Sequence, residues 1–119
     1  MSEPLIVFTT VGNPEQAKHL GRELVESRLA ACVSCMPDVV SIYRWAGAVQ
    51  EDSETLLWIK TTRARVEALR LHLLRIHPYE APEFLVVSIE QAGEAYLRWL
   101  EESTAPAAHA PGSVSGPLA

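Results

Sequence analysis

Residues 30–61, AACVSCMPDVVSIYRWAGAVQEDSETLLWIKT, decide the fold of this 119-residue chain. They hold β-rich segments on both sides of Ala46-Gly47-Ala48, a pattern typical of a hairpin. Taken as one strand with a kink at Pro37, residues 30–45 extend roughly 50 Å at about 3.3 Å per residue. A compact domain of about 100 residues is only about 35 Å across, because its radius of gyration is near 13 Å. The hairpin is therefore expected to project beyond the domain.

The far end of this hairpin is apolar, since it carries Ile42, Tyr43, Trp45 and Val49. Exposed apolar side chains beside unpaired strand edges favour association with other chains. We therefore expect an obligate symmetric oligomer. Tyr43, Trp45 and Trp58 could line an effector pocket, but packing at the interface between subunits is the interpretation we favour.

The rest of the chain supplies strands and helices around the hairpin. Residues 5–8 are continuously apolar and predict a strand buried on both faces, and residues 84–89 predict a last core strand. Helices are expected after Asn13 and after Thr62, because either side chain can cap a helix. A short final helix is expected around residues 96–100. The order βαββαβ plus a terminal helix predicts an α+β, ferredoxin-like fold with helices on one face of an antiparallel sheet.

Composition bounds the domain and its partners. We expect one domain over residues 1–102 and a flexible Ala/Pro/Gly/Ser tail over residues 103–119, because that tail buries too little apolar area to offset its ordering entropy. The net charge of −5 disfavours nucleic acid as a partner, since phosphate binding needs clustered Lys and Arg. No run is long enough to span a membrane, and the first residues lack the basic start of a secretory signal. A cytoplasmic location without a membrane partner is expected.

The sequence HPYEAPE, residues 77–83, is the second informative stretch. Its two prolines stop a helix and predict a rigid junction before the next strand. Lys60 and Glu54 fall on one face of a strand by period-two counting, so Lys60 could bind an anion or carboxylate there, although a salt bridge between subunits is favoured. A ligand cleft is predicted, lined by Lys60, Glu54, Tyr79, Glu80 and Glu83.

Candidate metal ligands and nucleophiles are few. Cys32 and Cys35 form a C-x-x-C sequence, but in a strand their Cα atoms lie about 10 Å apart, too far for a disulfide. Cys32 is interpreted as a small core residue in preference to a metal ligand. His77 is interpreted as a hydrogen-bonded imidazole at a helix end in preference to a metal ligand. No pattern of a nucleophile with its base is visible, so no enzyme is expected.

Together these motifs resemble the CutA divalent-cation tolerance family. The matching residues, in the family's order, are Arg28 to Val33, Ser41-x-Tyr43-x-Trp45-x-Gly47, Glu54, Lys60-Thr61, His77 to Glu83, and Tyr96-Leu97-x-Trp99-Leu100. The resemblance implies a homotrimer in which long hairpins pair between subunits, a role in tolerance to copper and other divalent cations, and weak metal binding. The family is also similar in architecture to the PII signalling trimers, so the alternative is a sensor of a small molecule or anion with clefts between subunits.

The resemblance further implies a copper site in some bacterial members, made of a first-strand cysteine and a His-His pair. The matching positions here hold Thr9, Ile76 and His77, so one of the three ligands is present. His77 with Glu80 or Glu83 would make a weak, unselective metal site unless subunits pooled their ligands. His77 and Cys32 are the two candidate metal ligands of the chain.

Overall fold

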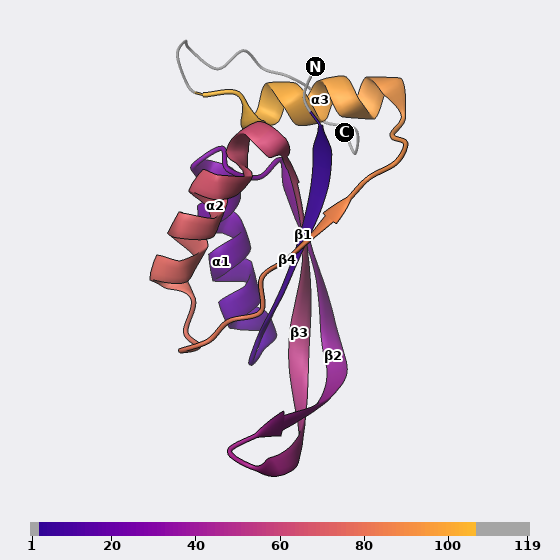
Figure 1. Ribbon diagram of the computed structural model, residues 1–119. Coiled ribbons are helices and arrows are strands. Elements are labelled where there is room, and N and C mark those ends of the chain that lie inside the picture. Colours follow the sequence, from indigo (N-terminus) through magenta and orange to yellow (C-terminus); the bar gives the residue numbers. More distant parts are fainter. Residues whose placement is uncertain (1–2, 107–119) are drawn as a thin grey trace.

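The computed structural model describes residues 3–106, which form a mixed α+β fold with a four-stranded antiparallel sheet and three helices (Figure 1). The elements are β1 (Pro4–Val11), α1 (Pro14–Glu26), β2 (Cys32–Trp45), β3 (Ala48–Thr62), α2 (Arg63–Ile76), β4 (Leu85–Ser88) and α3 (Glu94–Thr104). Their order along the chain is the predicted one. In space the strands follow the order β2-β3-β1-β4, and every neighbouring pair is antiparallel.

Both long helices begin where the sequence predicted, although only one uses a side-chain cap. Asn13 Oδ1 accepts a hydrogen bond of 2.9 Å from the backbone N–H of Gln16 and so caps α1. Thr62 occupies the N-cap position of α2, but its side chain makes no capping bond. Gly21 lets α1 lie close to β2, because a Cβ atom at this position would be only 3.1 Å from the side chain of Val33.

The core lies between the sheet and the helices α1 and α2, which cover the same face (Figure 1). Its fully buried large side chains include Leu5, Val7, Val11, Leu24, Leu57, Ile59, Leu69 and Leu73. Along β1, however, buried and half-buried residues alternate, so Ile6 and Phe8 point to the opposite face. The prediction that this strand is buried on both faces is wrong for the single chain, because α1 and α2 cover only one face.

The hairpin β2–β3 projects past the helices, as predicted (Figure 1). The molecule measures 49 × 28 × 26 Å, and its radius of gyration of 15.2 Å exceeds the roughly 13 Å of a compact domain of this size. Pairing between the strands shifts register between Met36 and Val39, where Asp38 has a φ of 61°, so a β-bulge marks the predicted kink. The part of the hairpin beyond this bulge, residues 39–54, is called the arm below.

The arm has two different faces. The register places Val40, Ile42 and Val49 on one face and Tyr43, Trp45 and Asp52 on the other. Val40 and Val49 are 62% and 65% exposed. At the tip, Ala46 and Gly47 both have positive φ values of 53° and 80°, which suits a two-residue hairpin loop.

The last strand differs from its prediction. Only residues 85–88 form β4, and this strand lies at the edge of the sheet beside β1. All four of its residues are exposed, with Leu85 at 55%, so residues 84–89 do not form a core strand. An apolar strand at a sheet edge has the same sequence pattern as a buried one, which explains the error.

Helix α3 lies across the end of the sheet where β1 begins (Figure 1). It ends at Thr104, two residues beyond the predicted end of the domain, and the remaining tail residues 107–119 lie outside the described residues. Arg28, in the left-handed region with a φ of 63°, binds the end of α3. Its Nε donates to the carbonyl of Ala105 at 2.6 Å and its Nη2 donates to that of Glu102 at 2.7 Å. These bonds satisfy carbonyls that a helix end leaves without partners.

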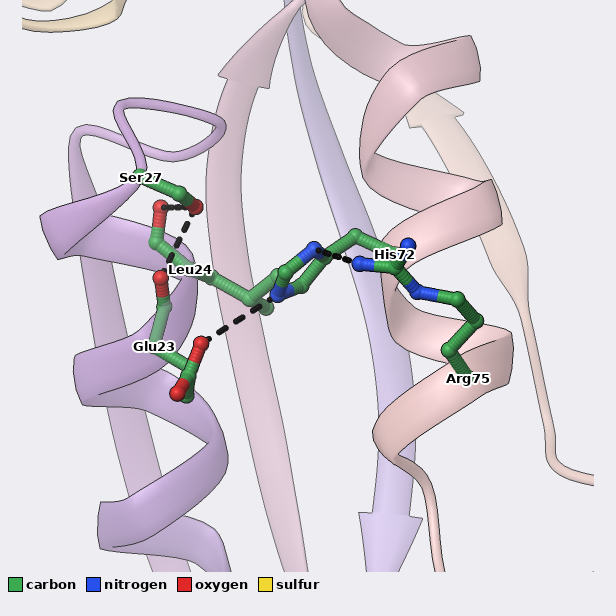
Figure 2. Close-up of polar contacts among 5 residues, drawn as sticks. All are labelled: Glu23, Leu24, Ser27, His72 and Arg75. Carbon is green, nitrogen blue, oxygen red and sulfur yellow. Dashed lines mark hydrogen bonds and ion pairs between the residues drawn. The ribbon is translucent and has the colours of Figure 1, made fainter.

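A polar bridge joins α1 to α2 on the helical side (Figure 2). Arg75 Nη2 donates to His72 Nδ1 at 3.0 Å, and His72 Nε2 lies 3.3 Å from Glu23 Oε2. Because a guanidinium can only donate, Nδ1 accepts and Nε2 carries the proton that faces Glu23. Within the described residues, no helix combines the length and apolar content that crossing a membrane requires.

Candidate functional site

A cavity of about 780 Å³ lies between the arm and the junction at residues 77–83. Its lining residues are Thr10, Gly12, Ser41, Ile42, Tyr43, Trp45, Asp52, Ser53, Glu54, Tyr79, Glu80, Ala81 and Glu83. The volume falls in the range of roughly 300–1,000 Å³ that is usual for small-molecule sites. The cavity below means this site.

Two tyrosine hydroxyls in the cavity donate hydrogen bonds to carboxylates. Tyr79 binds Glu54 Oε2 at 2.7 Å, and Tyr43 binds Asp52. Burial and the bond to Glu54 raise the pKa of Tyr79 far above its ordinary value, and the bond to Asp52 raises the pKa of Tyr43. Both phenols therefore stay protonated at neutral pH, and each fixes one carboxylate in place.

The cavity carries a negative charge that no side chain of its wall balances. Its lining includes the carboxyl groups of Asp52, Glu54, Glu80 and Glu83 but no Lys, Arg or His. Burial and repulsion from Glu54 raise the pKa of Glu83. A positively charged occupant would relieve this repulsion, so the electrostatics of the cavity favour cations.

The structure brings together four of the five residues predicted for the ligand cleft, namely Glu54, Tyr79, Glu80 and Glu83. Lys60 lies outside the cavity. It shares a face of β3 with Glu54, as counted from the sequence, but six residues separate them by roughly 20 Å. Lys60 Nζ instead donates to Ser34 Oγ at 3.1 Å.

The aromatic residues predicted for the subunit interface divide into two groups. Tyr43 and Trp45 line the cavity, whereas Trp58 packs edge-on against Phe8, with ring centroids 4.7 Å apart. Asp52 was missed by the sequence reasoning. The available signal was its period-two spacing from Glu54, which became informative only once β3 was known to begin at residue 48 rather than 55.

His77 lies at the end of α2, is only 8% exposed, and uses both ring nitrogens. The backbone N–H of Tyr79 donates to Nδ1 at 3.0 Å, so the proton of the neutral ring is on Nε2. Nε2 lies 2.9 Å from the carbonyl oxygen of Thr10 and 3.1 Å from Thr9 Oγ1. A metal ion could reach a lone pair of this ring only after the bond from Tyr79 had broken.

Cys32 is half-buried on the face of the sheet that α1 and α2 leave open. The register pairs Cys32 with Lys60 on that face, whereas Val33 and Ile59 point to the core. The interpretation of Cys32 as a core residue is therefore wrong. Its Sγ lies 3.8 Å from Lys60 Nζ.

The two candidate metal ligands do not meet, because His77 contacts Thr9 on the helix-covered face of the sheet while Cys32 is on the other face. Across residues 3–106, no group of three or more His, Cys, Asp or Glu side chains is arranged to hold a metal ion. Cys32 and Cys35 are both free thiols.

The burial of neutral His77 predicts a loss of stability in mild acid. Burial lowers the pKa of His77 below its ordinary 6.5, against smaller opposing effects of the Thr10 carbonyl and Glu54. The unfolded chain therefore takes up this proton first, so the contribution is complete above about pH 6.5 and is lost as pH falls through the folded pKa. Each pH unit within that window costs up to about 1.4 kcal/mol.

Urea unfolding at pH 7.5 and 5.5, at one protein concentration, measures this loss. His77→Gln should have a smaller difference between the two pH values than the unchanged chain, whereas exposed His19→Gln should match it. Equal differences in all three proteins would show that His77 is not responsible.

Comparisons with known proteins agree with this architecture. The family described as CutA1 divalent ion tolerance protein matches residues 5–103. The divalent-cation tolerance protein CutA of Thermus thermophilus is 43% identical over 99 residues, which are 83% of this chain and 96% of that protein. A solved structure of the divalent cation tolerance protein (Cut A1) from the same organism has a TM-score of 0.82 at 42% identity and covers 85% of this chain and 98% of that one.

Eukaryotic relatives are longer. Protein CutA of Mus musculus is 43% identical over 97 residues, which are 82% of this chain but 55% of that protein. A relative from Arabidopsis thaliana, named as chloroplastic, is 42% identical over 100 residues, 84% of this chain and 55% of its own length. The chain thus spans about half the length of these relatives. Because such names point to more than one compartment, a cytoplasmic location stays a prediction.

Proposed function

Because this chain belongs to the CutA1 divalent ion tolerance family, we propose that it is a homotrimer that binds divalent cations, copper among them, weakly in its acidic cavity. The observation that carries the proposal is the unbalanced charge of Asp52, Glu54, Glu80 and Glu83. Carboxylate and phenol oxygens bind hard and borderline divalent cations.

Binding is expected to be weak for a structural reason. The carboxylates of one chain are not arranged to surround an ion, since no such group of three exists among residues 3–106. An ion therefore keeps much of its water shell, or takes further ligands from a neighbouring subunit. The geometry of His77 favours this oxygen site over a histidine site, because both ring nitrogens already have partners.

The trimeric assembly is supported by the apolar surface that a single chain leaves uncovered. Val40, Ile42 and Val49 are exposed on one face of the arm, and Leu85 is exposed on the edge strand β4. Exposed strand edges and apolar faces of this kind associate with other chains. Symmetric association of identical chains covers the same patch on each of them.

Two other roles have less support. An anion effector would meet four carboxylates in the cavity, while Lys60, its expected partner, lies elsewhere. A catalytic role would need a nucleophile beside a base, and the cavity wall carries no Cys, Lys or His. The proposal is therefore cation binding without a reaction.

Titration calorimetry with Cu(II) and Mn(II) at fixed ionic strength tests the site. Glu54→Gln removes one ligand and one negative charge, so the affinity should fall about tenfold, equivalent to about 1.4 kcal/mol. Glu51→Gln is the matched control, because Glu51 is an exposed carboxylate of the same arm that does not line the cavity. Its affinity should equal that of the unchanged chain.

The opposite pattern would place the metal elsewhere. If His77→Gln abolishes Cu(II) binding while Glu54→Gln leaves it intact, the cavity is not the metal site.

A further inference from the structure

The negative charges of the cavity are spread around it rather than gathered at one point. Four carboxyl groups line a volume of about 780 Å³, yet no three acidic, His or Cys side chains within residues 3–106 are placed to hold one ion. A single metal ion can therefore neutralise only part of this charge. A longer cation that carries its charges some distance apart can approach several carboxylates at once.

The wall offers hydrogen-bond acceptors to such a ligand. The hydroxyls of Tyr79 and Tyr43 are already donated to Glu54 and Asp52, which leaves these carboxylates with unused lone pairs. With no Lys, Arg or His in the lining, the ligand is expected to bring N–H donors. Protonated nitrogen groups supply donors and positive charge together.

The same wall also presents aromatic and apolar surface. Tyr43, Trp45 and Tyr79 line the cavity together with Ile42 and Ala81. A cationic nitrogen over an aromatic ring gains roughly 0.5–1 kcal/mol at exposed sites, and a carbon chain packs against the apolar groups. A hydrated metal ion would use none of this apolar surface.

We propose that the cavity binds an extended organic cation, with two protonated nitrogen groups joined by a short carbon chain. Diamines and guanidino-amines belong to this class. This ligand class goes beyond the metal binding proposed above, although it occupies the same cavity.

Calorimetry on the full chain, with 1,4-diaminobutane as the probe, tests the proposal at fixed ionic strength. The diamine should bind at least tenfold more tightly than 1-aminobutane, because only the diamine reaches carboxylates at two places. 1,4-Butanediol, which has the same length but no charge, should give no binding. Equal affinity for the diamine and the monoamine would overturn the proposal.

Variants separate the organic cation from the metal. Trp45→Ala should weaken diamine binding about five- to tenfold but leave Mn(II) binding unchanged, since only the organic cation uses the ring. Glu54→Gln should weaken both ligands, and Glu51→Gln should weaken neither. Sedimentation of Trp45→Ala identifies any loss of assembly. If Trp45→Ala changes assembly, Glu80→Gln replaces it, and weaker diamine binding is again expected.

The outcomes distinguish the two proposals. If Mn(II) binds and the diamine does not, the organic-cation site is wrong and the metal site stands. If the diamine binds and neither Mn(II) nor Cu(II) does, the reverse holds. Diamine binding that is unchanged by Trp45→Ala and Glu80→Gln would also overturn the proposal, since the ligand would then be held by surface charge outside the cavity.

Discussion

The double variant Val40→Asp/Val49→Asp should sediment as one chain of about 13.1 kDa, whereas the unchanged protein should sediment at three times that mass. Both valines lie on the same face of the arm and neither lines the cavity. Association that buries this face removes both side chains from water, which is worth about 1.5–3 kcal/mol for each residue. The variant loses this gain and would bury two unpaired carboxylates, at several kcal/mol each.

The fold of the single chain should survive this change. Val40 and Val49 are more than 60% exposed, so their replacement removes little packing within the chain, and surface substitutions usually change stability by less than about 0.5 kcal/mol. Leu71→Asp is the matched control, because Leu71 is 54% exposed on α2, far along the chain from the arm. It should keep the mass of the unchanged protein.

Analytical ultracentrifugation over a range of concentrations measures these masses, and circular dichroism verifies the fold. A double variant that remains a trimer would show that this face of the arm is not an interface. An unchanged protein that sediments as a folded single chain would remove the assembly altogether.

The second large effect is expected at Arg28. Arg28→Ala should lower the free energy of unfolding by about 3 kcal/mol, since it removes two hydrogen bonds from a charged donor and each is worth about 1.5–3 kcal/mol. The bonds join the residues after α1 to the carbonyls of Glu102 and Ala105, which are more than 70 residues away along the chain. Their loss should release the C-terminal end of α3 from the domain.

Two further substitutions separate the side chain from the backbone at this position. Arg28→Gly loses the same bonds but relieves the left-handed backbone, which costs other residues about 1 kcal/mol, so it should be more stable than Arg28→Ala by about that amount. Arg28→Lys keeps the charge but not the forked geometry and should fall between Arg28→Ala and the unchanged chain.

Urea unfolding at one protein concentration measures these differences, and limited proteolysis reports whether α3 is released. Arg22→Ala is the control, because that arginine is on α1 with a side chain that is 77% exposed. Its stability should stay within about 0.5 kcal/mol of the unchanged chain. An equally small effect of Arg28→Ala would mean that its bonds do not hold α3.

Local sequence signals predicted much of the fold. Strand length against domain size predicted the projecting hairpin, and Asn13 predicted the start of α1. These signals work because they depend on residues that are close in sequence. The facing of Cys32 and the exposure of Leu85 depend on strand register and on the position of a strand in the sheet, which apolar patterning does not determine.

The candidate site follows the same division. Tyr79, Glu80 and Glu83 were predicted together because one short segment holds them, and Glu54 because of its place on a strand. Asp52 required the true length of β3, and the exclusion of Lys60 required the distance along it. The bridge from Glu23 to His72 joins helices 49 residues apart, and nothing in either helix announces it.

The exposed arm also sets the order of events after synthesis. A hairpin closed by a two-residue loop forms quickly from local contacts, so each newborn polypeptide has a sticky ribbon before it has met a sister. Maturation is then a race between productive docking and clumping, and its rate depends on how many copies are present. Scarce transcripts would favour neither event, whereas production from clustered ribosomes would bring sisters together early.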